Sequence, residues 1–324
     1  MPAAHLGVRQ LGSSGMDVSA LSLGSWRTFE RLPAETGIAI MRAARDEGIN
    51  FFDDARYNDE TGKAPIPTGY SEVLFGELFR GSGVRRDEAV VANKLWWEFW
   101  PEQSAAAELD ASLRRMRFDH VDLIYANPPP AALEVADLVA AVGGLVTAGK
   151  ARAWGLVNWP AGRCAQAIEA AASQGIAPPC AVQLPYSLVQ RSWVEDPTMT
   201  QALIAAGAGL IASFCLAGGV LTGKYRSAPA AGRVAGMLGE PRFAPAVAAA
   251  DQLAGMAARL DTTAAALALA FPLTNPAVTS VLFGATSVRQ LRANCAAVGL
   301  IDRLRPEDVA ALLRVGLPPA LADA

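Results

Sequence analysis

Eight short apolar segments, separated by longer amphipathic stretches, are the feature of this 324-residue sequence that most constrains its fold. Their length and apolar character predict β-strands at residues 20–23, 50–53, 89–93, 120–125, 151–156, 180–184, 209–213 and 279–283. Apolar periodicity predicts helices at residues 35–47, 71–80, 102–116, 133–148, 162–172 and 199–206. Eight strands alternating with helices favour an α/β fold of the (β/α)8 TIM-barrel type, which needs ~250 residues.

Further elements flank this repeat at both ends. Residues 7–18 are expected to form a small hairpin around a Gly-Ser-Ser-Gly turn, which would close the lower end of the barrel. Residues 262–271 add a helix to the regular set, and residues 288–297 and 306–313 are expected to form C-terminal helices. Because no Pro/Gly/Ser-rich linker divides the chain, residues 1–324 are predicted to form one domain.

Composition narrows the classes of function. Hydrophobic residues make up 52% of the chain and charged residues 18%, which is typical of a globular protein with a substantial core. A net charge of -3 without any Lys/Arg block argues against a general affinity for nucleic acid. The longest apolar run is too short to span a bilayer, and the N-terminus lacks the pattern of a secretory signal. We therefore expect neither a nucleic-acid partner nor a membrane partner.

Cysteine and histidine content bears on the compartment and on metals. The chain has only two histidines, His5 and His120. Its four cysteines are widely spaced, which fits free thiols in a reducing cytoplasm: Cys164, Cys180, Cys215 and Cys295. Without a cysteine pair or a histidine cluster, no metal site is expected.

Two long segments interrupt the repeat. Residues 58–70 are rich in Gly, Pro, Thr and Asp and follow the second predicted strand, whereas residues 224–245 follow the seventh. In a barrel, the loops that follow the strands form the rim where active sites lie. We therefore expect both segments to contact a substrate or a cofactor.

Polar side chains stand at the ends of three consecutive predicted strands. Asp53 and Tyr57 follow the second strand, Lys94 ends the third, and Asn127 follows the fourth. Strand ends on one rim of a barrel converge, so these four side chains are expected to meet in one pocket. A lysine held by Asp53 would lower the pKa of the Tyr57 phenol toward neutral pH, which would make this tyrosine a good proton donor.

Other interpretations of the same residues stay open. Asp53 and Lys94 could form an ion pair that only stabilises the barrel mouth. Lys94 could also be the Schiff-base amine of a barrel isomerase or aldolase. Aromatic residues on a rim loop could fill the core, but their density favours the wall of a substrate pocket. The tryptophans expected to line that pocket are Trp26, Trp96, Trp97 and Trp159.

Six short motifs are spread along nearly the whole chain. They are residues 48–53 (GINFFD), 93–94 (NK), 121–123 (VDL), 155–159 (GLVNW), 218–225 (GGVLTGKY) and 284–294. Each motif is weak alone, but together and in this order they resemble the aldo-keto reductase family. Residues 23–29 (LGSWRTF) and 125–127 (YAN) are similar to the branch of that family that contains the voltage-gated potassium channel β subunits.

The resemblance implies a TIM barrel that reduces a small carbonyl substrate with NADPH. Carried over by position, Asp53 orients Lys94, Lys94 perturbs Tyr57, Tyr57 is the general acid, and Asn127 hydrogen-bonds the carbonyl oxygen. The positions that match cofactor-binding positions of the family are Ser25, Trp26, Asn158, Gln183, Leu216, Gly218, Lys224, Arg233, Gly284, Thr286, Gln290 and Asn294. The cationic members of this set would meet phosphate groups, which favours NADPH over NADH.

Departures from the family pattern concentrate near the chemistry. Asn127 stands where most members have histidine; an amide donates a hydrogen bond without changing charge, so an active but slow reductase is expected. Only Arg56 separates Ala55 from Tyr57, one residue fewer than usual, and this leaves Tyr70 as the alternative proton donor.

The nicotinamide shelf departs from the pattern as well. Val157 replaces the usual serine, and Ser213-Phe214-Cys215 replaces the usual aromatic-Ser-Pro sequence, with Phe214 as a possible substitute for the stacking ring. A rival function also remains: an NADPH-binding interaction module that senses redox state with little turnover. The sequence does not indicate an oligomeric state.

Overall fold

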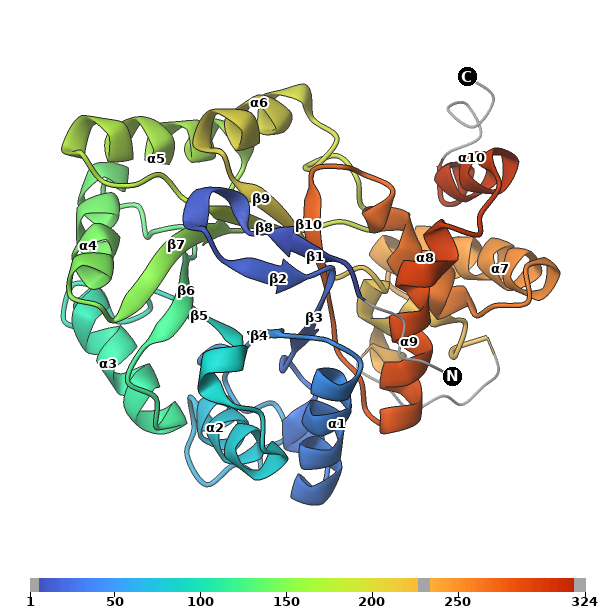
Figure 1. The fold of residues 1–324 in the computed structure, drawn as a ribbon, viewed down its shortest axis with the longest axis horizontal. Coiled ribbons are helices and arrows are strands. Elements are labelled where there is room, and N and C mark those ends of the chain that lie inside the picture. Colours follow the sequence, from blue (N-terminus) through green and yellow to red (C-terminus); the bar gives the residue numbers. More distant parts are fainter. Residues whose placement is uncertain (1–5, 227–233, 318–324) are drawn as a thin grey trace.

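Eight parallel strands close into a barrel in the computed structural model, which describes residues 6–226 and 234–317. Around the barrel the strands follow the order β10 (Val278–Phe283), β3 (Leu21–Gly24), β4 (Phe51–Asp53), β5 (Val90–Leu95), β6 (Val121–Ala126), β7 (Ala151–Val157), β8 (Ala181–Pro185) and β9 (Gly209–Ser213). Because β10 pairs with both β3 and β9, the ring is closed (Figure 1). The predicted TIM-barrel fold is confirmed.

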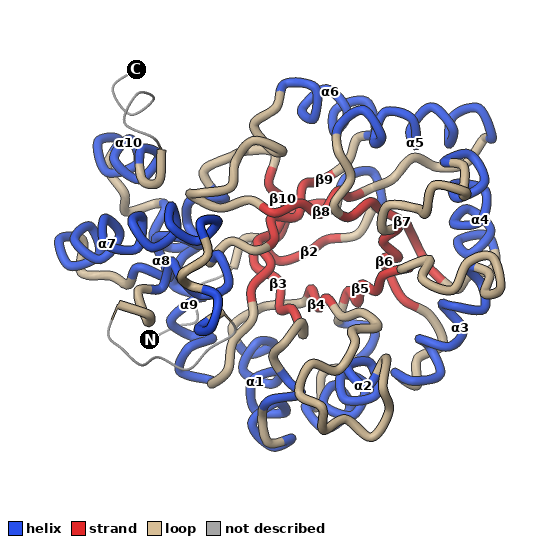
Figure 2. Tube along the Cα trace, turned by 180° about the vertical axis from the view of Figure 1, so that it is seen from behind, coloured by secondary structure: helices blue, strands red, loops and turns tan. Residues whose placement is uncertain are grey.

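Helices surround the ring of strands (Figure 2). Six of them lie close to their predicted bounds: α1 (Ala34–Asp46), α2 (Tyr70–Ser82), α3 (Ala105–Met116), α4 (Val135–Thr147), α5 (Ala161–Gln174) and α6 (Pro197–Ala206). The C-terminal helices are α7 (Ala244–Arg259), α8 (Ala264–Leu273), α9 (Val288–Ile301) and α10 (Pro306–Arg314). In Figure 1 they gather on the β10 side of the barrel.

One prediction about these helices is wrong. The segment at 262–271 was expected to supplement the regular set, but its helix, α8, packs directly against β10 and is almost entirely buried. It is therefore the barrel helix that joins β9 to β10. The additional helix is α7, most of which the sequence did not predict, and it packs against α8 from outside.

Among the described residues, no single helix is both long and apolar enough to cross a membrane. The segments Pro241–Arg259 and Ala264–Leu273 pass that test only as a pair, with a bend of 99° between them. Most of the second segment is buried against the barrel.

Side-chain alternation along the strands decides what faces the barrel interior. Phe51 belongs to the apolar cluster inside the barrel, whereas Phe52 packs in the layer between strands and helices. Because alternate residues of a strand share a face, Asp53 points inward as Phe51 does. The same rule applies to Lys94, two residues after the inward-facing Ala92, and to Gln183, two residues after Ala181.

The predicted N-terminal hairpin is present and lies across the lower mouth of the barrel (Figure 1). Its strands are β1 (Val8–Gln10) and β2 (Asp17–Ser19), and Leu11 packs into the inner apolar cluster. The turn approaches the barrel so closely that a Cβ atom on Gly12 would lie 2.2 Å from the carbonyl oxygen of Cys180. Only glycine fits at that position, which also has a positive φ of 50°.

Candidate active site

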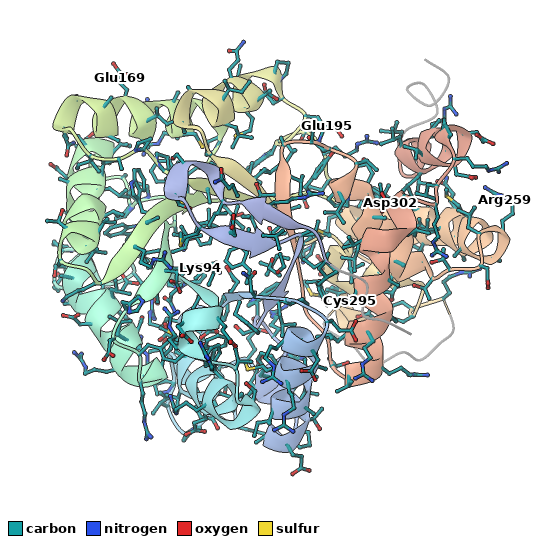
Figure 3. The ribbon with its side chains drawn as sticks, viewed as in Figure 1. Lys94, Glu169, Glu195, Arg259, Cys295 and Asp302 are labelled. Carbon is teal, nitrogen blue, oxygen red and sulfur yellow. The ribbon has the colours of Figure 1, made fainter. Side chains whose placement is uncertain are left out.

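The C-terminal ends of the strands surround a cavity of about 400 Å³. All four residues proposed for catalysis line it: Asp53, Tyr57, Lys94 and Asn127. Figure 3 shows Lys94 among the strands at the centre of the ring of helices, whereas Glu169 and Arg259 lie on outer helices. The alternation of the strands thus brings side chains that are far apart in sequence to one mouth of the barrel.

A chain of polar contacts joins Asp53, Lys94 and Tyr57. The Lys94 ammonium forms an ion pair with Oδ1 of Asp53 and donates a hydrogen bond of 3.3 Å to the Tyr57 hydroxyl. Asp53 and Lys94 are only 2% and 5% exposed, so their charges interact with little screening by water. Lys94 also lies 5.8 Å from the ring centroid of Tyr57 and 5.9 Å from that of Tyr125, within the range of cation–π attraction.

The backbone around Tyr57 is held by the start of α2. The Ser71 hydroxyl donates to the carbonyl of Ala55 and accepts from the backbone N–H of Tyr57, at 2.6 and 3.0 Å. The N–H of Gly69 donates to the Tyr57 carbonyl at 3.1 Å. Tyr57 therefore reaches the cavity although the segment before it is one residue short, whereas Tyr70 packs against the outer apolar core.

The prediction that the pKa of the Tyr57 phenol is lowered toward neutral pH is wrong. Burial raises the pKa of Tyr57 well above its usual value, and the nearby carboxylates, Asp53 first among them, raise it further. The positive charge of Lys94, which is paired with Asp53, does not outweigh these effects in the resting site. Tyr57 consequently holds its proton at neutral pH.

Asn127 presents an amide where the sequence lacks a histidine. Its Nδ2 donates to the carbonyl of Leu95 at 3.0 Å, and its backbone N–H donates to the same carbonyl at 3.1 Å. These two contacts fix the amide at the rim of the cavity. A terminal amide carries two N–H bonds, so one donor of Nδ2 is left for another acceptor.

Aromatic rings form one wall of the cavity. The ring of Tyr57 is 5.9 Å from that of Trp96, in an edge-to-face arrangement, and 6.5 Å from that of Trp26. Trp26 in turn lies 6.4 Å from Phe214. All four rings line the cavity, so this side suits a flat or apolar group.

Two of the predicted pocket tryptophans lie outside the cavity. Trp97 is buried in the layer between strands and helices, and its indole N–H donates to the carbonyl of Asn127 at 3.0 Å. Trp159 is fully buried there and donates to the carbonyl of Ala126 at 2.9 Å. Both therefore support the backbone at the end of β6, and the prediction that they line the substrate pocket is corrected.

The first of the two long loops differs from expectation. No residue from 58 to 70 lines the cavity; Glu60 instead pairs with Arg27 and Arg31 at the rim. Lys224 does line the cavity, but residues 227–233 of the second loop lie outside the described part of the chain.

Arg56 was not singled out in the sequence, yet it ties two rim loops together. It is 5% exposed, and its guanidinium donates to Thr68 at 2.7 Å and to Glu98 at 2.6 Å. One arginine thus connects the loop after Tyr57 with the loop that carries Trp96. Sequence patterns gave no signal for this contact, because the partners are far apart and their pairing depends on how both loops fold.

Asp54 is a buried carboxyl group without a cationic partner among the described residues. It is fully buried; its Oδ1 accepts a hydrogen bond from Ser25, and its Oδ2 has no hydrogen-bond partner. Burial raises the pKa of Asp54 well above its usual value, and the charge of Glu72 raises it further. The folded protein therefore favours the neutral acid at this position.

We expect Asp54→Asn to stabilise the protein at neutral and alkaline pH. Because the folded-state pKa of Asp54 is raised, wild-type stability is retained below the unfolded pKa of about 3.9 and falls as pH rises toward the folded value. The difference in unfolding free energy between variant and wild type should grow by about 1.4 kcal/mol per pH unit within that window. Urea unfolding from pH 4 to pH 8 measures it.

Asp59→Asn is a control for which the pH dependence of the unfolding free energy should have the opposite sign. The Thr61 side chain and the backbone N–H groups of Thr61, Lys63 and Ala64 lower the pKa of Asp59 to about 2. Its contribution is therefore present above the unfolded pKa and is lost as pH falls toward about 2. A pH-independent difference for Asp54→Asn would contradict the neutral-acid assignment.

Most positions matched to a cofactor line this same cavity. Nine of them line it: Trp26, Asn158, Gln183, Leu216, Gly218, Lys224, Gly284, Thr286 and Gln290. Neither Ser25 nor Asn294 lines the cavity; Ser25 donates to Asp54, and Asn294 is 2% exposed with no partner for its Nδ2. Arg233 lies outside the described residues. Their role in cofactor binding stays a prediction.

Backbone conformation also marks this rim. Non-glycine residues adopt positive φ at Arg27, Trp97, Asn158, Phe214 and Ala217, all just after strands of the barrel. Such conformations cost energy and cluster at functional sites. Within the described residues, no group of three His, Cys, Asp or Glu side chains is arranged to hold a metal ion.

Comparison with known proteins matches the chain to a family. Residues 20–315, from the first barrel strand to the end of α10, match the model of the aldo/keto reductase family. The chain belongs to the aldo/keto reductase family. Members of this family are typically NAD(P)H-dependent oxidoreductases.

Two relatives of this aldo/keto reductase align over nearly their full lengths. A probable voltage-gated potassium channel subunit beta from Oryza sativa subsp. japonica is 32% identical over 316 residues, covering 93% of this chain and 94% of the relative. A protein of the same description from Arabidopsis thaliana is 31% identical, covering 92% and 93%. The branch suggested by the motifs LGSWRTF and YAN is therefore confirmed.

Proposed function

We propose that this aldo/keto reductase uses NADPH to reduce a small aldehyde or ketone by hydride transfer. One observation carries the proposal: the hydroxyl of Tyr57 lies at the end of the buried Asp53–Lys94 pair and faces an aromatic-walled cavity. A proton donor of this kind is what reduction of a carbonyl group requires.

Features of the cavity rim support binding of a dinucleotide cofactor. Gly218 and Gly219 have φ values of 69° and 93°, and a Cβ atom on either would lie 2.8 Å from Val234 or 3.0 Å from Lys224. Both glycines line the cavity, and backbone without a Cβ atom leaves room there for a phosphate group. Lys224 supplies positive charge beside them, and Thr286 and Gln290 hydrogen-bond each other at 3.0 Å at the start of α9. NADPH, when bound, would supply the hydride.

The chain's own residues would handle the proton and the orientation of the carbonyl. Tyr57 would donate its proton to the oxygen as negative charge develops there, and Lys94 would stabilise the phenolate that remains. The free N–H of Asn127 would donate to the same oxygen. Unlike a histidine, this amide cannot supply a proton, so we propose that Tyr57 is the sole proton donor.

Turnover tests the proposal directly. Purified protein with NADPH should reduce members of a panel of aliphatic and aromatic aldehydes and ketones, measured by loss of absorbance of the reduced nicotinamide. Aromatic carbonyls should be preferred, because Trp26, Trp96 and Phe214 form one wall of the cavity. No turnover across the whole panel would overturn the proposed function.

We expect reduction to be nearly independent of pH between neutral and moderately alkaline conditions. The raised pKa of Tyr57 keeps the general acid protonated, so its activity would decline only when pH approaches that raised value. The measurement is kcat for the reduction at saturating NADPH from pH 7 to pH 9, with an expected change within ~2-fold. A decline of kcat with an apparent pKa near neutral pH would contradict the assignment of Tyr57 as a general acid with a raised pKa.

A second candidate function follows from the relatives. Their names describe potassium channel subunits, so this chain could bind NADPH and report redox state to a partner protein with little turnover. Tight binding of NADPH, measured by quenching of tryptophan fluorescence, would favour this function if no member of the carbonyl panel is turned over. Absence of both NADPH binding and carbonyl turnover would favour Schiff-base chemistry at Lys94, which needs no nicotinamide cofactor.

A further inference from the structure

Asp53 has a second partner besides Lys94. The side-chain Nε2 of Gln183 donates a 3.0 Å hydrogen bond to Oδ2 of Asp53, while Lys94 occupies Oδ1. Gln183 is 4% exposed and Asp53 is 2% exposed, so water does not compete for this contact. Each oxygen of the buried carboxylate therefore has its own donor.

The contact spans the mouth of the barrel. Asp53 ends β4 and Gln183 lies in β8, and in the order β10-β3-β4-β5-β6-β7-β8-β9 these strands are on opposite sides of the ring. Lys94, from the adjacent strand β5, binds the carboxylate on its other oxygen. Two donors from different sides restrict the carboxylate to one orientation.

The negative charge of Asp53 determines which end of the Gln183 amide faces it. An ionised carboxylate only accepts hydrogen bonds, so the nitrogen of Gln183, not its oxygen, must face Asp53. The backbone carbonyl of Gln183 separately accepts from the N–H of Asn158 at 2.9 Å, and this contact does not depend on the side chain. A substitution at Gln183 can therefore change the Asp53 contact while Asn158 keeps its partner.

We propose that Gln183 is a positioning residue for catalysis, which holds Asp53 toward Lys94 and so keeps Lys94 within reach of Tyr57. This role is additional to any contact that Gln183 makes with a bound cofactor, and its catalytic part rests on the proposed reductase function. Because Gln183 also lines the cavity, it connects the cofactor side of the site with the proton donor.

Gln183→Glu tests the inference through pH. While the introduced carboxyl is protonated, it can donate to Asp53 as the amide does; once ionised, it repels Asp53. We expect kcat of the variant, relative to wild type at saturating NADPH, to fall ~10-fold or more between about pH 5.5 and pH 8.5. Gln183→Met removes the donor at every pH, and its kcat should be low throughout.

Stability of the cofactor-free protein supplies an independent measurement. The loss of stability caused by Gln183→Glu should grow as pH rises, and this growth should become smaller when Asp53→Asn is added, because the repulsion between two carboxylates is then removed and only the cost of burying the introduced charge remains. Persistence of the same pH dependence with Asp53→Asn would overturn the inference, as would a relative kcat that does not change with pH. If wild type shows no turnover, the reductase function fails, and the stability comparison alone decides whether Gln183 holds Asp53.

Discussion

Tyr57→Phe should abolish most of the carbonyl reduction while NADPH still binds. The change removes only the hydroxyl that accepts from Lys94, and the ring that contacts Trp26 and Trp96 remains. Loss of a general acid typically lowers the rate by ~10²–10⁴-fold, and we expect kcat to fall within that range. Steady-state kinetics measure the loss, and quenching of protein fluorescence by NADPH measures retained binding.

Tyr70→Phe is the matched control, because Tyr70 does not line the cavity. It should leave kcat and NADPH binding unchanged. If Tyr57→Phe kept more than ~10% of wild-type kcat, Tyr57 would not be the general acid. A large loss in Tyr70→Phe instead would transfer that role to Tyr70.

Lys94→Met should be the most damaging single substitution for both stability and turnover. It leaves the Asp53 carboxylate buried and charged, with Gln183 as its remaining hydrogen-bond donor among the described contacts. Breaking a buried ion pair by removing one partner costs about 3–5 kcal/mol, and we expect the free energy of unfolding to drop by that amount. Turnover should be lost as well, because no charge remains to stabilise the Tyr57 phenolate.

The double variant Asp53→Asn with Lys94→Met separates the two effects. A neutral amide at position 53 needs no cation, so unfolding in urea at pH 7 should show that much of the lost stability returns. Turnover should stay absent, because the amine is still missing. Equal stability of the single and double variants would mean that the cost does not come from an uncompensated Asp53 charge.

Strand alternation explains why much of the candidate site could be predicted from sequence. Asp53 and Lys94 sit at or next to the ends of β4 and β5, and Gln183 lies within β8, where burial of alternate residues fixes the direction of each side chain. This rule does not apply to the loops that follow the strands. Trp96 and Trp97 are adjacent in a loop, and the positive φ of Trp97 sends its ring into the outer core while Trp96 faces the cavity.

Other features depend on information that a local pattern does not carry. Helix α7 follows a segment that carries glycines, prolines and basic residues and that was expected to be a loop up to residue 245, and the helix was missed. The pKa of Tyr57 was predicted in the wrong direction, because its outcome depends first on full burial and then on the combined charge of the neighbouring Asp53 and Asp54 and of the more distant Glu30 and Glu72. The segment before Tyr57, which is one residue short, could be recognised from the sequence. The two hydrogen bonds of the Ser71 hydroxyl that hold the backbone on either side of it could not.

The position of Arg56 has a consequence for transplanting loops between related reductases. Its guanidinium donates to Thr68 from one loop and to Glu98 from the other, so the two loops are structurally linked. Exchanging either loop alone would leave a buried cation short of a partner, and the exchange would then fail for reasons unrelated to substrate fit. Engineering of this pocket therefore has to treat residues 56–69 and 96–100 as a single unit of replacement.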